Sequence, residues 1–436
     1  MPGRDNLPMP DQRDPAVQVP LFAACNAAID CADGAFERPG PVGLTTPRQA
    51  LNLCPMPVTD RLAPSSWAMR PSVDGSAVKI EVYWHPSTWP TDVEALFARA
   101  ERERIGMGPA WYRNLIDTAP QPESTVHFYV LRRHQIPVAA LPILIQQRPR
   151  RTLSALSNFY TSLFAPVMAP AEGAPALSLL LQAVLAEHGP LQRLEFGPMD
   201  PQGQAFASLR AALKANGLVT FDYFCHGNWY LPVRSDWPSY WQQREGSLRS
   251  TVRRMEKKLK AANACIEILH KPQDVERGIA AFSQAYARSW KRAEPHPNFM
   301  PGLIRLCAEH GWLRLGLVSI GDQAIAAQLW IVAHGRAEVY KLAYDEAFKG
   351  FAPGTVLTAR LLQHVFDVDR VAEVDYLIGD DGYKAQWMSE RRERWGLLAY
   401  NPRTLAGLFG CLRESAGRGF KVARARLRGM RAGTRG

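Results

Sequence analysis

The stretch that decides the fold runs from Gly335 to Trp387; it reads GRAEVYKLAYD over 335–345, KGFAPGT over 349–355 and VDYLIGDDGYKAQW over 374–387. Residues 339–344 alternate with period two over β-forming side chains, which predicts a strand. Apolar residues then recur at 357, 361, 365 and 368, the spacing of a helix that covers a sheet. Residues 371–378 predict a second strand, which ends at Gly379. The sequence therefore predicts a strand, a glycine loop, a helix and a strand.

The glycine loop of this unit has the composition of an anion site. A helix N-terminus carries unpaired amides and a partial positive charge, so a phosphate placed there is stabilised. Gly350 and Gly354 would let the backbone approach that phosphate, Lys349 would add a full charge, and Thr355 stands at the helix start. An ordinary tight turn between a strand and a helix explains the same residues, and the loop alone leaves both readings open.

The ordered motifs around this unit resemble the GNAT-fold acyltransferases of the cellulose-biosynthesis CelD type, which in turn resemble the FemAB peptidyltransferases. The resemblance covers roughly 228–400 and rests on LAYD at 342–345, PGT at 353–355, VDY at 374–376 and GDDGYK at 379–384, with SWK at 289–291 upstream. It implies an α/β (α+β) fold of two tandem GNAT-like domains, each a mixed central sheet flanked by helices. It also implies acyl transfer from a thioester, with acetyl-CoA or another acyl-CoA as co-substrate.

Length and composition set the domain limits. The chain has 436 residues, and 12 of its 34 prolines fall in residues 1–76, which we expect to be a flexible extension. We predict an N-terminal GNAT-like domain at 77–227, a C-terminal acyltransferase domain at 228–402 and a basic tail at 403–436. The seven cysteines form no CxxC pair and no Cys/His ligand spacing, so no metal site is predicted. We expect a cytoplasmic chain.

Alternating and helical patterns predict the main elements of both domains. In the first domain we expect strands at 78–83, 127–132, 136–145 and 193–196, helices at 92–104 and 177–188, and a polar loop at 158–162, which the resemblance places near the cleft between the domains. In the second we expect a strand at 264–269, helices at 275–291 and 299–310, and a hairpin of 313–319 with 323–334.

A basic amphipathic helix is predicted at 244–260, where seven basic residues stand against two acidic ones. Two interpretations of this helix remain open: its basic face binds an anionic ligand, or it is only exposed to solvent. Arg253 and Arg254 match the arginine pair of the family, so the resemblance assigns them to substrate binding. It places Trp290 and Lys291 beside the acceptor site, where a purely packing role for the Trp is the alternative.

The resemblance also suggests where the chemistry occurs. In the family, the strand that corresponds to residues 340–345 separates from its neighbour, so that amides near Leu342 and Ala343 bind the pantetheine arm and polarise the thioester. The acceptor must lose a proton, and we assign Asp375 as base or orienting residue, Tyr383 as proton donor and Lys384 as a contact for an anionic acceptor. A structural pair of Asp375 with Lys384 is the alternative.

One residue departs from the family pattern. Pro353 removes an amide donor from the loop, where ordinary GNAT enzymes read Gln/Arg-x-x-Gly-x-Gly/Ala, and FemAB-like relatives accept aminoacyl-tRNA through a similarly altered loop. We expect an acyltransferase that acts on a small-molecule or glycan acceptor in polysaccharide or cell-envelope biosynthesis. The alternatives are an aminoacyl-tRNA-dependent transferase and a non-catalytic partner of a membrane polysaccharide synthase. Apart from tRNA in the first alternative, no nucleic-acid partner is expected.

The basic tail supplies most of the formal net charge of +11. From Arg413 to Arg435 it has eight basic residues and one acidic residue, Glu414, which gives 8 − 1 = +7. Apolar residues are interspersed among them. An amphipathic helix on anionic lipid at the inner face of the membrane is one interpretation, and a disordered solubilising tail is the other.

Overall fold

The structure is a computed structural model that describes residues 65–68, 78–121, 123–146 and 151–433. The residues from Pro64 onward form one compact unit. Most of the predicted extension at 1–76 lies outside the described residues. Within it, β1 (Ser65–Ala68) pairs antiparallel with β2 (Val78–Tyr83), so the regular structure begins earlier than the sequence predicts.

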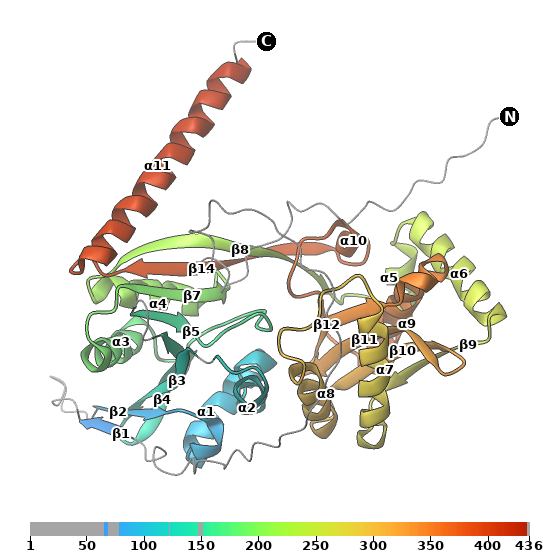
Figure 1. Cartoon of the computed structure of the whole chain (residues 1–436), viewed down its shortest axis with the longest axis horizontal. Helices are drawn as coiled ribbons and strands as arrows, with labels where there is room; N and C mark the ends of the chain where they lie inside the picture. Colours follow the sequence, from blue (N-terminus) through green and yellow to red (C-terminus); the bar gives the residue numbers. More distant parts are fainter. Residues whose placement is uncertain (1–64, 69–77, 122, 147–150, 434–436) are drawn as a thin grey trace, which may run out of the picture. The chain divides into compact units, whose positions relative to one another are not determined.

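One mixed sheet of 14 strands runs through the described chain in the order β1-β2-β3-β4-β5-β7-β14-β8-β13-β12-β11-β10-β9, with β6 paired to β4 (Figure 1). The remaining strands are β3 (Ser124–Arg133), β4 (Ile136–Gln146), β5 (Thr152–Ala155), β6 (Val167–Met168), β7 (Arg193–Met199), β8 (Val219–Pro232), β9 (Ala264–Leu269), β10 (Leu313–Ile320), β11 (Gln323–Ala333), β12 (Arg336–Tyr344), β13 (Glu373–Asp375) and β14 (Glu390–Tyr400).

The strand order has an internal symmetry. On one side, β2 to β5 are antiparallel neighbours, and the next step, from β5 to β7, is parallel. On the other side, β9 to β12 are antiparallel neighbours, and the next step, from β12 to β13, is again parallel. The long pair β8 and β14 joins the two halves at the centre. The fold class is therefore mixed α/β, as predicted, with one large mixed sheet whose two halves repeat the same order of antiparallel and parallel steps.

Each half contributes a strand to the other. Strand β14, from the end of the chain, pairs with β7 of the first half, and β8, which follows the first half, pairs with β13 of the second. The predicted domain boundary at 227/228 falls inside β8, so this one strand belongs to both halves of the sheet. The division into 77–227 and 228–402 itself stays a prediction.

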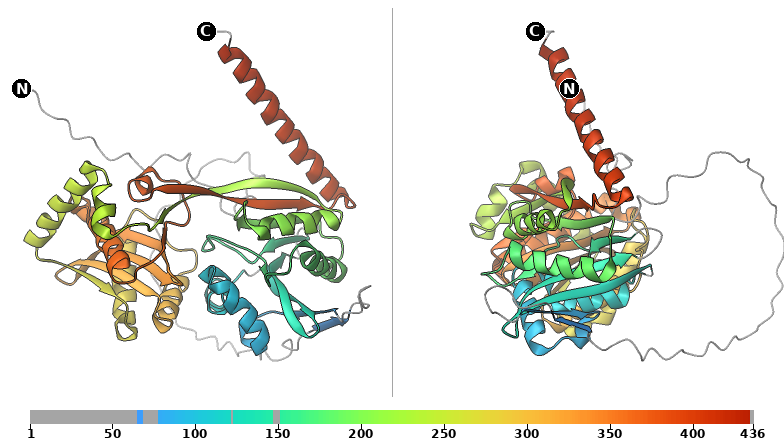
Figure 2. Two further views of the ribbon diagram at one scale, coloured as in Figure 1. Left: turned by 180° about the vertical axis from the view of Figure 1, so that it is seen from behind. Right: turned by 90° about the vertical axis from the view of Figure 1, so that its left-hand side faces the viewer.

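Helices flank the sheet, and most lie where the periodicity predicts them. Helix α3 packs against α4 and against β3 and β4, whereas α7 and α9 both pack against β10 to β12. Helix α11 follows β14 and continues away from the sheet in the views of Figure 2. The helices are α1 (Thr91–Glu101), α2 (Pro109–Thr118), α3 (Ala174–His188), α4 (Gln204–Ala215), α5 (Trp237–Gln242), α6 (Gly246–Ala261), α7 (Val275–Ala287), α8 (Phe299–Glu309), α9 (Pro353–Asp367), α10 (Gly382–Ala385) and α11 (Leu405–Gly433).

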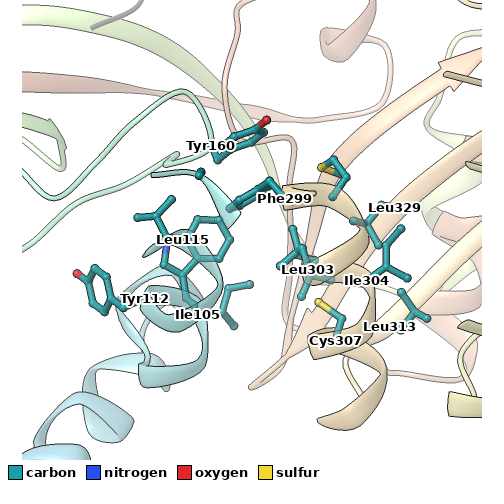
Figure 3. Packing of buried hydrophobic residues seen from close by; sticks show 14 of the residues in the cluster. Ile105, Tyr112, Leu115, Tyr160, Phe299, Leu303, Ile304, Cys307, Leu313 and Leu329 are labelled. Carbon is teal, nitrogen blue, oxygen red and sulfur yellow. The ribbon is translucent and has the colours of Figure 1, made fainter. Parts of the chain in front are cut away.

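A shared hydrophobic cluster holds the halves together. It combines side chains of α2 in the first half with side chains of α8, β10 and β11 in the second (Figure 3). The rings of Trp111 and Phe299 meet edge to face with centroids 5.7 Å apart, and the ring of Tyr160 stacks on that of Phe299 with centroids 3.7 Å apart. Tyr160 belongs to the predicted polar loop at 158–162. Its stack on Phe299 of α8 therefore fixes this loop against the second half.

The second strand of the opening motif is shorter than predicted. The sequence predicts a strand over 371–378, but β13 covers only Glu373–Asp375. The Asp375 carboxylate accepts a hydrogen bond from the Leu377 amide at 2.8 Å, and Leu377 takes the left-handed conformation with φ of 54°. Such a local side-chain bond replaces the sheet ladder and turns the backbone. The predicted helix at 275–291 likewise ends early, at Ala287, ahead of Trp290 and Lys291.

Candidate functional site

The first element of the site is a strand edge that opens within the sheet. Strand β12 pairs with β13 only over Arg336 to Glu338, whereas it pairs with β11 along its whole length to Tyr344. In the described chain, residues 339–344 therefore have no strand partner on the β13 side. Backbone amides and carbonyls on such an edge are available to an extended ligand. The predicted separation of this strand from its neighbour is observed, and Leu342 and Ala343 lie in the separated part.

The open edge leads directly into the predicted glycine loop. After β12, the 3₁₀ helix η6 (Glu346–Phe351) is capped by Asp345, which accepts a hydrogen bond from the Ala347 amide at 2.9 Å. Ala352 then takes the left-handed conformation, with φ of 43°, and Pro353 opens α9. The first helical bond joins the Val356 amide to the Ala352 carbonyl at 3.2 Å. The amides of Gly354 and Thr355 precede that bond, so they are free to bind an anion.

Two buried side chains and one lysine fix this loop. The side-chain amide of Gln328 donates to the Gly354 carbonyl at 2.9 Å and to the Thr358 hydroxyl at 2.9 Å. From α6, the Lys258 ammonium donates to the Gly350 carbonyl at 2.9 Å and lies 4.5 Å from the Phe351 ring. Lys349 is exposed beside them. In the sequence, Lys258 is one of the seven basic residues of the predicted helix at 244–260. The spacing of these residues does not indicate the contact of Lys258 with Gly350.

The structure does not bring the predicted arginine pair into the loop. Arg253 and Arg254 are exposed on α6 and form no ion pair with the part of the chain that the structure describes. Their helix does lie beside the loop, since Glu256 pairs with Arg360 of α9 at 3.1 Å and Lys258 reaches Gly350. The substrate-binding role of the two arginines stays a prediction.

Aromatic and basic side chains gather at the open edge. The Trp290 ring packs on Tyr344, at the end of β12, with centroids 4.6 Å apart. Lys341 of β12 pairs with Glu294 at 2.8 Å, and its ammonium lies 4.7 Å from the Phe159 ring, which belongs to the loop of the first half. The Tyr340 hydroxyl donates to the backbone carbonyl of that loop, at Tyr160, over 2.9 Å. The first half thus forms one wall beside the strand edge.

Lys291 is a partly buried lysine of this region whose pKa is shifted toward neutrality. Burial lowers the pKa of its amine to about 8, the nearby charge of Lys341 acts in the same direction, and Glu294 opposes the shift. Its ammonium makes no ion pair with the residues that the structure describes, in contrast to Lys341 and Lys384. An amine with a pKa near 8 is neutral in part of the molecules at neutral pH, so it can accept a proton.

Lys384 and Tyr383 lie on α10, at the far side of the same region. The Lys384 ammonium is buried, pairs with Asp381 at 3.1 Å and donates to the Ile378 carbonyl at 2.6 Å. Burial lowers the pKa of Lys384, and Asp381 opposes that shift. The Tyr383 ring contacts that of Tyr376, and burial raises the pKa of Tyr383, so its hydroxyl keeps its proton at neutral pH.

Asp375 lies at the junction of the two halves. Its buried carboxylate accepts hydrogen bonds from Arg104 at 3.0 Å, Arg392 at 2.5 Å, Asn228 at 2.6 Å and the Leu377 amide at 2.8 Å. Burial alone would raise the pKa of Asp375, but the two arginines and the hydrogen bonds outweigh it and lower the pKa. A carboxylate held by four donors is a poor proton acceptor. We predicted Asp375 as a base or as an orienting residue, and the geometry favours the orienting role. The alternative was a structural pair with Lys384, but the charged partners of Asp375 are Arg104 and Arg392.

Three possible ligand residues meet away from this region. Ligand atoms of His127, Glu187 and His188 lie within 4.8 Å of one another, although their sequence spacing predicts no metal site. The Tyr129 hydroxyl donates to the Glu187 carboxylate at 2.8 Å and lies 2.7 Å from the His188 ring nitrogen. Two of the three residues are thus hydrogen-bonded to Tyr129, whereas a ring nitrogen of His127 lies 3.2 Å from the Thr125 carbonyl.

The comparison with known families agrees with the geometry of the second half. Residues 246–385, which include the open edge, the glycine loop and α10, match the acetyltransferase (GNAT) domain family. The chain therefore carries a GNAT-type acetyltransferase domain, and it is a transferase. The finer likeness to the CelD type stays a prediction. No curated protein matches the sequence.

Solved structures resemble more of the chain than this domain. FemX is 12% identical and aligns over 68% of this chain and 92% of its own, with a TM-score of 0.50. A tandem GNAT protein from the clavulanic acid biosynthesis pathway aligns over 77% and 98% at 13% identity, with a TM-score of 0.42. The C-terminal domain of a putative lysylphosphatidylglycerol synthetase from Agrobacterium fabrum aligns over 70% and 90% at 12% identity, with a TM-score of 0.43. At such identities the likeness shows the fold alone, and it rests on FemX, whose TM-score is 0.50.

Proposed function

We propose that this protein transfers an acyl group from acyl-CoA to an amine or hydroxyl of a small-molecule or glycan acceptor, in polysaccharide or cell-envelope biosynthesis. One observation carries the proposal: the open edge of β12 leads through η6 into the N-terminus of α9. An extended arm that ends in a diphosphate requires two such surfaces in this order, an unpaired strand edge and an anion site. Coenzyme A has this form.

The residues of the loop suit the donor. The diphosphate would lie at the amides of Gly354 and Thr355, with Lys349 and Lys258 as nearby positive charges. The pantetheine arm would pair with the edge of β12 around Leu342 and Ala343. An amide of this edge that points at the thioester carbonyl would stabilise the developing oxyanion, an effect worth about 3 kcal/mol of barrier.

The groups around the edge suit the proton transfers. When the acceptor nitrogen or oxygen attacks the thioester carbon, it loses a proton and the carbon–sulfur bond breaks. Lys291, with its pKa of about 8, can take the proton from the acceptor. Tyr383 can supply one to the departing thiolate, and Lys384 offers a positive charge to an anionic acceptor. Asp375 acts through the backbone of Leu377 as a positioning residue for this segment.

Calorimetry tests the donor site. We expect acetyl-CoA and free CoA to bind the full chain with micromolar affinity, and Gly354→Trp to abolish binding, because the position lies in the first turn of α9, where a Cβ would already lie 3.4 Å from Tyr344. Gly246→Trp is the matched control, since Gly246 also lies in the first turn of a helix and a Cβ there meets nothing within 4 Å. Absence of binding to the folded wild type would exclude acyl-CoA as donor.

An aminoacyl-tRNA donor is the second candidate. Pro353 removes one amide from the first turn of α9, and the fold resembles that of FemX. This candidate predicts that ribonuclease abolishes transfer and that acetyl-CoA does not bind. Transfer that survives ribonuclease treatment would exclude it.

A further inference from the structure

Helix α11 is attached to the body of the protein by one face. A Cβ at Gly407 would lie 2.0 Å from the Asn401 carbonyl, and one at Gly410 would lie 2.4 Å from the Tyr400 ring, so both positions require glycine at this contact. Further along the same face, Cys411 is buried, and Arg418 donates to the Asp222 carbonyl at 2.8 Å. The end of β14 and the start of β8 thus cover this face of the helix.

The opposite face is apolar and points to solvent. Leu405 is 90% exposed, Phe409 is 68% exposed, Leu412 is 61% exposed and Leu408 is 43% exposed. Their spacing of three, four and seven places them on one stripe of the helix. A surface helix normally turns such a stripe toward the core, so the orientation is reversed here. An exposed contiguous apolar patch of this kind marks an interaction surface.

The sequence extends this pattern along the helix. After Leu412, the sequence continues with apolar residues at Ala416, Phe420, Ala423 and Leu427, and basic residues are interspersed among them. From Arg413 to Arg435, eight basic residues against one acidic residue give 8 − 1 = +7. The apolar stripe is therefore followed in the sequence by a strongly basic segment.

A partner for this surface must offer apolar and negatively charged groups side by side over the length of the helix. A second copy of the helix offers the apolar stripe but repeats the same positive charge, so it would be repelled. The surface of an anionic bilayer offers both, because acyl chains lie directly beneath charged headgroups. The apolar stripe and the basic segment that follows it in the sequence match that interface.

We propose that α11 binds the surface of anionic lipid membranes through the stripe that contains Leu405, Leu408, Phe409 and Leu412. The attachment of the opposite face to β14 and β8 keeps the stripe exposed in the free protein. Membrane binding would hold the acetyltransferase domain at the membrane surface. The proposal stands independently of the acyl donor.

Vesicle cosedimentation of the full chain tests this binding. We expect binding to phosphatidylcholine–phosphatidylglycerol vesicles, little binding to phosphatidylcholine vesicles, and a decrease as salt is raised. The double variant Phe409→Ser/Leu412→Ser should bind at least about tenfold more weakly, since two stripe residues no longer enter the acyl region. Its substitutions are at exposed positions, so the fold should be kept, as circular dichroism can verify.

The matched control is Ile136→Ser/Val368→Ser, which removes two side chains that are 64% and 63% exposed outside α11. It should bind vesicles like the wild type. Equal binding by the α11 double variant and the wild type would overturn the proposal, as would a wild type that leaves anionic vesicles unbound. A dimer in light scattering that the α11 double variant dissociates would also overturn it, and would identify a second copy as the occupant.

Discussion

The carboxylate of Asp375 is expected to be a main determinant of stability, and Asp375→Asn tests this. The substitution removes the charge that faces Arg104 and Arg392 while keeping the size of the side chain. Loss of one partner from a buried ion pair costs about 3–5 kcal/mol, because the remaining charge stays buried. Here Glu373 still lies 3.5 Å from Arg104 and 2.9 Å from Arg392. We therefore expect the lower end of that range, about 3 kcal/mol.

Urea unfolding followed by tryptophan fluorescence measures this loss of unfolding free energy. Glu276→Gln is the control, since its pair with Arg305 is on the surface, and it should leave the midpoint unchanged. A loss of less than about 1 kcal/mol for Asp375→Asn would refute the structural role assigned to the junction.

The same variant has a pH signature. The pKa of Asp375 is lower in the folded than in the unfolded chain, where it is about 3.9, so its contribution is complete above that value. The contribution is lost as pH falls through the folded pKa. The difference in stability between wild type and variant should thus be constant near neutral pH and narrow only below about pH 4. A difference that already narrows between pH 5 and about pH 7 would contradict this assignment.

Three further variants test the site. If Lys291 accepts the proton, the transfer rate should rise with pH through about 8, and Lys291→Gln should remove that limb of the profile; a limb that persists in the variant would exclude the role. Gln328→Leu removes the acceptor of the buried Trp330 indole N–H and one donor to the Gly354 carbonyl, which keeps its hydrogen bond from the Thr358 hydroxyl. Urea unfolding should therefore show a loss of about 2 kcal/mol, mainly from the unpaired indole N–H. Lys258→Met should weaken CoA binding about fivefold in calorimetry, because it removes a positive charge beside the loop. The urea midpoint should not change, because the lost hydrogen bond to the Gly350 carbonyl is exposed. An unchanged affinity would show that this lysine is dispensable.

The local elements of the site were predictable from the sequence. Alternation over 339–344, the glycine loop at 349–355 and the apolar spacing that follows predicted a strand, a loop and a helix, which correspond to β12, the segment that begins with η6, and α9. The 3₁₀ helix itself was not predicted. These patterns reflect interactions between residues close in the chain. The end of β13 was not predictable in this way, because it depends on a side-chain bond from Asp375 to Leu377 that the alternating pattern does not show.

Contacts across long sequence separations escaped prediction. Arg104 and Asp375 are 271 residues apart, and neither sequence neighbourhood indicates the other. The pairing of β8 with β13 and of β14 with β7 depends on how the whole sheet assembles. The contact of the loop at 158–162 with Lys341 depends on the same assembly. Sequence reasoning found the loop and Lys291, but the low pKa of this lysine follows from tertiary burial and the nearby Lys341.

Amide hydrogen exchange with and without acetyl-CoA tests the central claim most directly, because it reports on the two backbone surfaces assigned to the donor. We predict slower exchange on ligand binding in residues 339–344 of β12 and at Gly354 and Thr355 of α9, with the region around Gly246 unchanged. Binding of acetyl-CoA that leaves exchange in both segments unaltered, or that protects a different region, would contradict this account of the site.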